Sequence, residues 1–221
     1  MKIAIVIAAF NEAKRVDKVI KDVKAAGFPW VIVVDDGSSD TTCVVADRAG
    51  ADALRHPINR GQGAGLRTGI HYALENGADI IVTYDADGQF LAKEISSVIA
   101  PIKKGKVDVV LGSRFLGSAV NIDFGKKLVL KLGVLVTYIF SGIKLSDSHN
   151  GFRAMNKKAA SLIDITFDRM EHASEIIDEI ARHRLRYVEV PVTVIYHERG
   201  QHPLRSLKMG IKLLAKKVFG W

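Results

Sequence analysis

The sequence predicts one α/β domain spanning residues 1–221, with a mostly parallel sheet and helices on both of its faces. Three observations support this fold class. The 221 residues suit a single domain with a sizeable core, 48% of them are hydrophobic, and short apolar runs alternate with helical patterns in the first half. Such sheets bind ligands at the carboxyl ends of their strands, so the loops after the apolar runs are the candidate functional segments.

In the first half, strands and helices alternate along the chain. Apolar residues run almost continuously in the strands predicted at residues 3–8, 30–35, 53–55, 80–84 and 107–111. Helices are predicted at residues 12–26, 41–49, 65–76 and 93–104. The first helix has one apolar face at helical spacing, formed by Val16, Val19, Ile20 and Val23. Asp40 stands directly before the second helix and is expected to cap it.

The second half is less regular. Residues 124–143 form a long apolar helical pattern with three lysines, too short and too charged to span a bilayer comfortably. We expect this helix to be part of the core or to lie against a membrane surface. Pro191 interrupts the strand predicted at 186–194, which we therefore expect at a sheet edge or a bulge. The other predicted elements are a strand at 151–155 and helices at 157–163 and 175–184.

The charge balance favours anionic partners. The formal net charge is +8 and the pI is near 9.5, which suits phosphorylated ligands, nucleic acid or an anionic membrane. Nucleic acid is disfavoured, because basic residues are not interleaved with aromatic residues along a face. The single cysteine, Cys43, excludes an internal disulfide and favours a reducing, cytoplasmic location. The apolar start of the chain has one basic residue and is predicted to be the first strand, not a signal peptide.

The end of the chain is basic and amphipathic. Residues 205–221 contain five basic residues and no acid. An apolar stripe at helical spacing is formed by Leu207, Ile211, Leu214 and Val218. The pattern predicts a basic amphipathic helix around 204–219, which either packs on the sheet or docks on the cytoplasmic face of an anionic membrane.

The most informative motif is the segment from Asp85 to Gln89, which follows the strand predicted at 80–84. Side chains alternate along a strand, so Asp85 and Asp87 point to the same side. Two crowded carboxylates repel unless a positive group lies between them, and a divalent cation that also binds phosphate oxygens is a natural partner. The motif predicts a cation-dependent site for a nucleoside diphosphate; two solvated loop carboxylates are the alternative.

A second pair of acids, Asp35 and Asp36, ends the strand predicted at 30–35. One of them is expected to accept hydrogen bonds from a ribose or a base edge. A Gly-rich segment at 59–65 opens a helix and is either structural or phosphate-binding. It is not a P-loop, because no Lys-Ser/Thr follows, and no Gly-x-Gly-x-x-Gly follows the first strand. A dinucleotide-binding fold is therefore disfavoured.

Together these motifs resemble the family-2 glycosyltransferases with a GT-A fold, a Rossmann-like nucleotide-binding domain. The resemblance is strongest to the branch that transfers sugars to dolichyl or polyprenyl phosphate. The matching segments follow the family's order along roughly the whole chain: 8–12, 34–42, 59–63, 85–89, 112–114, Asp147 and 151–153.

The resemblance implies a metal-dependent, inverting transfer of a sugar from a UDP- or GDP-sugar to an acceptor, with Mg²⁺ or Mn²⁺ as cofactor. It implies metal binding by Asp85, Asp87 and Gln89. It implies nucleotide binding by Ala8, Phe10, Asn11, Glu12, Asp35, Asp36, Gly63, Asp85, Ala86 and Arg199. It implies catalytic roles for Asp87, Arg114, Asp147 and Arg153. The arginines would face the donor diphosphate or an acceptor phosphate.

The acceptor side departs from this branch. His149-Asn150 precedes Gly-Phe-Arg where the branch usually has Thr-Ser, and residues 198–203 do not match it cleanly. We also expect no transmembrane tail of the kind that some relatives carry. A lipid phosphate and a soluble or polysaccharide sugar acceptor both remain open. Candidate acids and bases on this side are Asp147, Glu171, Glu175, His149 and His172. A phosphate acceptor needs no strong base, because it is already mostly anionic at neutral pH.

Two other classes remain as alternatives. A sugar-1-phosphate nucleotidyltransferase needs a basic Gly-rich loop after the first strand, where this chain has Asn11 and Glu12. A non-catalytic scaffold built on a decayed transferase is disfavoured by the intact Asp85 and Asp87.

Overall fold

The structure, a computed structural model, describes residues 1–196 of the chain. Arg199 and the basic helix predicted around 204–219 lie outside these residues. Within residues 1–196, one sheet has the strand order β3-β2-β1-β4-β6-β5-β7. Its strands are β1 (Ile3–Ala9), β2 (Val31–Asp35), β3 (Asp52–Arg55), β4 (Ile80–Asp85), β5 (Val109–Val120), β6 (Arg153–Asn156) and β7 (Tyr187–Ile195).

The strand pairing is mostly parallel. β1 pairs in parallel with β2 and with β4, β2 with β3, and β5 with β7. Of these strands β6 alone is antiparallel to its neighbours, β4 and β5. The predicted sheet is confirmed, with one reversed strand. Because β6 is reversed, its first residue, Arg153, lies at the same sheet edge as the carboxyl end of β4, between Thr83 of β4 and Leu111 of β5.

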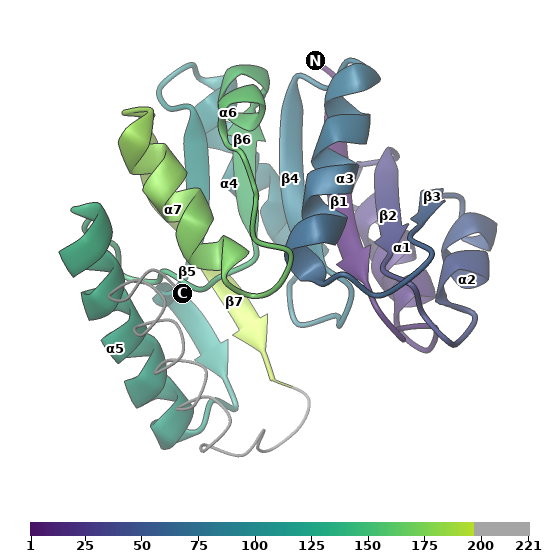
Figure 1. Cartoon of the computed structure of the whole chain (residues 1–221), viewed down its shortest axis with the longest axis horizontal. Coiled ribbons are helices and arrows are strands. Elements are labelled where there is room, and N and C mark those ends of the chain that lie inside the picture. Colours follow the sequence, from purple (N-terminus) through teal and green to yellow (C-terminus); the bar gives the residue numbers. More distant parts are fainter. Residues whose placement is uncertain (197–221) are drawn as a thin grey trace.

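Helices cover both faces of the sheet (Figure 1). They are α1 (Val16–Ala25), α2 (Thr42–Arg48), α3 (Gln62–Glu75), the 3-10 helix η1 (Ala92–Glu94), α4 (Ile95–Lys103), α5 (Phe124–Ser141), α6 (Lys157–Leu162) and α7 (His172–Arg182). One buried cluster joins α1, α2 and α4 to one face, and a second joins α3, α6 and α7 to the other. The strands therefore have apolar residues on both sides, as their continuous apolar runs predict.

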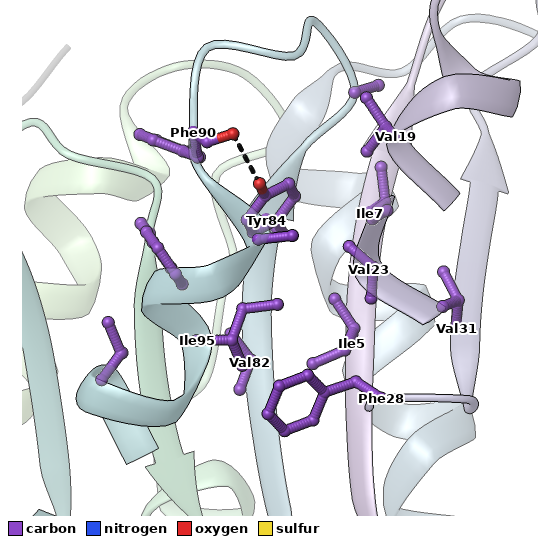
Figure 2. Close-up of a cluster of buried hydrophobic side chains, with 14 of the residues drawn as sticks. Ile5, Ile7, Val19, Val23, Phe28, Val31, Val82, Tyr84, Phe90 and Ile95 are labelled. Atoms are coloured by element: carbon purple, nitrogen blue, oxygen red, sulfur yellow. Dashed lines mark hydrogen bonds between the residues drawn. The ribbon is translucent and has the colours of Figure 1, made fainter. Parts of the chain in front are cut away.

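The first cluster also fixes the loop that follows β4 (Figure 2). The Tyr84 hydroxyl donates a hydrogen bond to the carbonyl oxygen of Phe90 at 2.7 Å. The rings of Tyr84, Phe90 and Phe152 pack edge-on or tilted, with centroids 5.2–5.5 Å apart. A buried aromatic side chain contributes roughly 1.5–3 kcal/mol to stability. The loop carrying Asp85 and Asp87 is thus anchored in the core at both ends.

Several elements differ from their predicted bounds. α3 begins at Gln62 and not at residue 65, because Gly61 occupies its N-cap position with a φ of 122°. α7 begins at His172 and not at residue 175. The N-cap of α2 is Thr41; Asp40 lies one residue earlier and accepts a hydrogen bond from the backbone N–H of Thr42 at 2.9 Å.

β5 is the largest departure, because it continues to Val120 where the sequence predicts an end at residue 111. After an irregularity between Ser113 and Ser118 it pairs again with β7, beyond the main sheet. β7 is the edge strand that Pro191 predicts. The extended end of β5 leads into α5, which lies at the outer margin of the molecule beyond α7 (Figure 1). Of the helices described, none has the length and apolar character needed to cross a membrane.

Candidate active site

Four strands bring the predicted site residues to one edge of the sheet. β1, β2 and β4 end there at Ala9, Asp35 and Asp85, and β6 begins there at Arg153. After β1 the chain adds β2 on one side and β4 on the other, so the order reverses at β1. Crevices at such a reversal, outside the carboxyl ends of the strands, are where open α/β sheets bind ligands.

Asp85 is the last residue of β4 and the most perturbed carboxyl group at this edge. Burial and the negative charge of Asp87 raise the pKa of Asp85 to about 7, although Arg153 and Arg114 act in the opposite direction. The side-chain amide of Gln62 donates a hydrogen bond to Asp85 Oδ1 at 3.0 Å. Without a positive partner, two ionised carboxylates here are costly.

Gly151 allows the chain to pass close to the Asp85 carboxylate. A Cβ atom at this position would lie 2.8 Å from Asp85 Oδ1 and 2.9 Å from Oδ2, closer than real Cβ atoms approach oxygen. The hydroxyl of Thr83 donates a hydrogen bond to the Gly151 carbonyl at 2.6 Å and fixes this approach. The position before Phe152-Arg153 is therefore a glycine because any side chain there would collide with Asp85.

The donor set fits a divalent cation that arrives with a phosphorylated substrate. Among residues 1–196, no group of three or more His, Cys, Asp or Glu side chains could hold a metal alone. Mg²⁺ is usually held by only one or two carboxylates plus substrate phosphates, and Asp85 and Asp87 can supply these. The backbone N–H of Gln89 donates to Asp87 Oδ1 at 3.0 Å, so Gln89 orients the second carboxylate through its main chain.

Two buried arginines stand beside the acids, each fixed by its neighbours. Arg114 donates from Nε to Asp147 Oδ2 at 2.6 Å and from Nη2 to the carbonyl of His149 at 2.8 Å. Arg153 donates from Nε to the carbonyl of Asn150 at 2.9 Å. Burial lowers the pKa of Arg153 to about 10, while Asp85 and Asp147 raise it, so the group stays charged. The two arginines supply positive charge beside Asp85.

Asp147 is the ion-pair partner of Arg114. Its Oδ2 also accepts from the Arg114 backbone N–H at 3.1 Å. Glu189 on β7 was not among the residues predicted from the sequence. Its carboxylate accepts hydrogen bonds from Ser146 N and Oγ and from Asp147 N, all within 3.1 Å. A glutamate in a strand is its only sequence signal. Glu189 orients Asp147, which in turn orients Arg114.

The two acids that follow β2 have different surroundings. Asp36 Oδ1 accepts a hydrogen bond from the Arg60 backbone N–H at 3.0 Å and lies 2.8 Å from His56 Nδ1, and its Oδ2 accepts from Gly61 N–H at 2.6 Å. Asp35 Oδ1 accepts from Ser38 N–H at 3.1 Å. Asp35 Oδ2 is buried with no hydrogen-bond partner in the described part of the chain, 3.4 Å from Arg55 Nε.

The loop after β1 is tied to the loop after β2. Asn11 has a φ of 56°, a conformation that Asn tolerates better than most residues. Its N–H donates to Ser38 Oγ at 2.8 Å, and its Oδ1 accepts from the Ser39 N–H at 3.0 Å. The Glu12 N–H donates to Thr42 Oγ1 at 2.9 Å. Phe10 is exposed above these contacts, so the aromatic ring of the first motif is accessible to a ligand.

The remaining members of the nucleotide set lie nearby. Ala8 pairs with Asp85 across the β1–β4 ladder, and Ala86 is buried directly after Asp85. A Cβ at Gly63 would lie 2.0 Å from the Phe167 carbonyl oxygen, and one at Gly61 would lie 2.4 Å from that of Asp168. Close backbone packing therefore explains both glycines, and it favours the structural interpretation of the Gly-rich segment.

Most of the candidate bases and acids of the acceptor side already have hydrogen-bond partners within the protein. His172 Nδ1 lies 2.7 Å from the Arg169 carbonyl, and burial lowers its pKa to about 4, with Arg153 adding to this effect. Glu175 accepts hydrogen bonds from the backbone N–H groups of Thr166 and Phe167. His149 Nδ1 lies 2.8 Å from Ser148 Oγ. Glu171 occupies the N-cap position of α7 without a side-chain capping bond.

Lys126 is a second residue near the site that was not predicted from the sequence. Its Nζ lies 4.1 Å from the centre of the Tyr196 ring, within cation–π range. Burial and the positive charge of Arg114 lower the pKa of Lys126, whereas Asp87 raises it. α5 therefore brings a third cation towards the site. In the sequence, Lys126 is one of three lysines in an apolar helical pattern, and nothing distinguishes it from the other two.

The family assignment follows from a direct match. Residues 4–163 match the family model described as Glycosyl transferase family 2. The chain belongs to glycosyltransferase family 2. The matched region contains the four strand ends and every site residue described above except Glu189, Tyr196 and those of α7 and its preceding loop. The expectation of a family-2 glycosyltransferase is confirmed.

Curated relatives agree with the branch that the motifs indicate. The glycosyltransferase is 31% identical to the UDP-N-acetylglucosamine–dolichyl-phosphate N-acetylglucosaminyltransferase of Methanococcus voltae, over 98% of this chain and 96% of that protein. It is 30% identical to the undecaprenyl-phosphate mannosyltransferase of Micrococcus luteus, over 91% of this chain and 86% of that protein. Both names describe transfer to a polyprenyl-type phosphate, so the predicted branch is confirmed.

A solved structure confirms the GT-A fold. Glucosyl-3-phosphoglycerate synthase from Mycobacterium tuberculosis, crystallised with Mn²⁺, UDP and glucosyl-3-phosphoglycerate, superposes with a TM-score of 0.74. The superposition covers 98% of this glycosyltransferase and 79% of the synthase at 18% sequence identity. At this identity the likeness concerns the fold.

Proposed function

We propose that this glycosyltransferase is a metal-dependent, inverting enzyme that moves a sugar from a UDP- or GDP-sugar to a polyprenyl or dolichyl phosphate. The observation that carries the proposal is the carboxylate pair Asp85 and Asp87 beside the fixed, buried arginines Arg114 and Arg153. A nucleoside diphosphate held through a cation needs both kinds of group. The names of the two curated relatives support the lipid-phosphate acceptor, and one of them names a UDP-sugar.

The nucleoside is proposed to lie over the carboxyl ends of β1 and β2. Asp35 Oδ2 is a buried acceptor that lies 3.4 Å from Arg55 Nε and has no hydrogen-bond partner among the described residues, and a ribose hydroxyl or a base N–H would satisfy it. Phe10 offers an exposed ring next to this position. Asp36 is proposed to position the loop at Gly61, because its oxygens already accept hydrogen bonds from that loop.

Asp85 and Asp87 are proposed to hold Mg²⁺ or Mn²⁺ together with the donor diphosphate. Bound there, the cation would act as a Lewis acid that stabilises charge on the departing nucleoside diphosphate. Arg114 and Arg153 add positive charge from fixed positions, so little reorganisation is needed during the reaction. Arg199 was assigned to the same phosphates from the sequence and lies outside the described residues.

The proposed reaction is one direct displacement. An oxygen of the acceptor phosphate forms a bond to the anomeric carbon while the bond from that carbon to the donor diphosphate breaks, and the configuration inverts. A phosphate monoester has its second pKa near 6, so the nucleophile is mostly anionic at neutral pH. The enzyme then needs positioning more than a strong base. The structure agrees with this low need for a base, because Asp147 forms an ion pair with Arg114.

A lipid-linked acceptor requires access to a bilayer. We therefore infer a peripheral position on the cytoplasmic face of a membrane, which the net charge of +8 favours when the lipid is anionic.

A transfer assay with two acceptors tests the proposal. The full chain is incubated with UDP-N-acetylglucosamine, UDP-glucose or GDP-mannose, with Mn²⁺ or with EDTA, and with a short-chain polyprenyl phosphate or a soluble sugar. Product on the polyprenyl phosphate, lost in EDTA and in Asp87→Ala, is expected. Product on the soluble sugar alone would contradict the acceptor, and full activity in EDTA would contradict the metal role.

A further inference from the structure

We propose that the outward face of α5 is a membrane-docking surface that rests on an anionic bilayer. The inference deepens the proposed function, since it gives the site a route to a lipid-linked acceptor. Its evidence is separate, however, because it comes from the exposure and charge of α5 and not from the nucleotide site.

The outward face of α5 is a continuous apolar stripe. Successive residues of a helix are about 100° apart, so positions i, i+4, i+8, i+11 and i+15 fall within about 80° of one another. Five exposed large apolar residues of α5 have this spacing, and a sixth, Tyr138, lies beside them: the five are Phe124, Leu128, Leu132, Leu135 and Ile139. Each is at least 50% exposed. Scattered single apolar residues are normal on a protein surface, but a contiguous apolar patch marks an interaction site.

The other long helices behave differently. α1 and α7 also have apolar faces, but they bury them against the sheet, as Val16 and Ile176 show. α5 lies at the outer margin of the molecule (Figure 1), and its stripe faces away from the core. Leu116 and Val120, at the end of β5, add exposed apolar side chains just before the helix begins.

The charge of α5 favours an anionic bilayer over a second copy of the chain. The helix contains Lys126, Lys127 and Lys131 and no acid. Lys127 and Lys131 are exposed and lie along one side of the stripe, by helical spacing. Lysines beside an apolar face can stay at the lipid headgroups while the apolar side chains insert. Pairing with the same face of a second copy would bring lysines together without acids on α5 to balance them.

The opposite face of α5 leads to the active site. Lys126 packs over the Tyr196 ring, and the Tyr196 hydroxyl accepts a hydrogen bond from Arg114 Nη1 at 2.5 Å. Gly133 allows the His149 ring to lie against the helix, because a Cβ there would be 2.9 Å from the ring. One helix therefore presents apolar side chains outwards and contacts the neighbours of Arg114 inwards.

Vesicle binding of the full chain tests the surface. Leu128→Glu/Leu132→Glu places two charges on the exposed stripe without removing a buried side chain. The matched control is Val44→Glu, on the exposed side of α2, where the side chain is 48% exposed. We expect binding to vesicles of equal parts phosphatidylcholine and phosphatidylglycerol to weaken at least tenfold in the double variant and less than twofold in the control. Equal binding of the double variant and the unmodified chain would overturn the proposal.

A fluorescent probe tests whether another occupant covers the stripe. Leu132→Cys in a Cys43→Ser chain is labelled with an environment-sensitive dye. Emission typical of water, shifting to the blue when the same anionic vesicles are added, is expected. Emission that is already blue-shifted without vesicles would mean that the chain's own C-terminal segment or a second copy covers the stripe, and the proposal would be wrong.

Nucleotide binding separates this inference from the proposed function. Binding of UDP and GDP with Mn²⁺ in the absence of vesicles should be the same in the double variant and the unmodified chain. Vesicle binding without nucleotide binding would leave the docking surface supported and reject the proposed function. Nucleotide binding without vesicle binding would reject the docking surface alone.

Discussion

The carboxylate of Asp36 holds the backbone of Gly61, since Asp36 Oδ2 accepts the Gly61 N–H at 2.6 Å. The next residue is Gln62, whose side-chain amide donates to Asp85. The loop at Gly61 and Gln62 therefore connects Asp36, which follows β2, to Asp85 at the end of β4. Asp36 therefore acts through the loop, as a positioning residue.

Asp36 and Asp35 should respond differently to substitution. Asp36→Ala removes a buried charged acceptor of several hydrogen bonds, and we expect it to cost about 2–4 kcal/mol of stability. Asp35→Asn keeps Oδ1 and loses only an ion pair to Arg55, whose side chain is 58% exposed, so it should change stability by less than about 1 kcal/mol. It should weaken nucleotide binding about tenfold or more, with or without metal. Urea unfolding and calorimetric titration with UDP and GDP measure the two effects. If the two variants lose similar stability and bind nucleotide equally well, Asp36 and Asp35 do not have the separate positioning and nucleotide-binding roles described.

Gly151→Ala should disturb the carboxylate pair while the fold persists. The added Cβ would meet both oxygens of Asp85, so the carboxylate must move. We expect metal-dependent binding of UDP or GDP to weaken at least tenfold and metal-independent binding to change little. Calorimetric titrations with Mn²⁺ and with EDTA measure this, and circular dichroism checks the fold. Unchanged affinity in Mn²⁺ would mean that Asp85 takes no part in metal binding.

His172 should make stability depend on pH. Burial lowers the pKa of His172 to about 4 from its ordinary value of 6.5, so the unfolded chain binds more protons between these values. The stabilisation from neutral His172 is complete above pH 6.5 and is lost as the pH falls towards 4. Its full size is on the order of 3 kcal/mol.

The matched comparison is His172→Gln, which cannot titrate. Urea unfolding at pH 7.5 and pH 4.5 should show a loss of stability that is roughly 2 kcal/mol smaller in the variant than in the unmodified chain. If both chains lose the same stability between these two pH values, the buried histidine does not titrate as described.

The sequence predicted the fold well where local patterns decide the structure. Continuous apolar runs locate β1, β2 and β4, each of the other strands overlaps a predicted strand, and Pro191 places β7 at the edge of the sheet. The predicted bounds of strands and helices are wrong where tertiary contacts determine where an element begins or ends. β5 continues to Val120 because β7 pairs with it beyond the main sheet, and no apolar alternation marks that extension. α3 begins earlier than predicted, within the Gly-rich segment, which packs on the backbone at Phe167 and Asp168.

For the site, the sequence located the acids but not all of their partners. The position of Asp85 at the end of β4, with Asp87 in the turn that follows, can be predicted from the apolar run that precedes them and needs no tertiary information. The difference between Asp35 and Asp36 depends on a loop some 25 residues away that supplies N–H groups to only one of them. Glu189 and Lys126 come from a distant strand and helix, and their positions follow only from how those elements pack.

The most direct test of the central claim is calorimetric titration of UDP and GDP into the full chain and Asp87→Ala, each in Mn²⁺ and in EDTA. A nucleoside diphosphate held through a cation at Asp85 and Asp87 predicts tighter binding in Mn²⁺ than in EDTA, by at least tenfold, for the unmodified chain. Asp87→Ala should bind equally weakly in both conditions while Asp35→Asn keeps the metal effect. If Asp87→Ala retains the full gain from Mn²⁺, these acids do not hold the metal and the account is wrong.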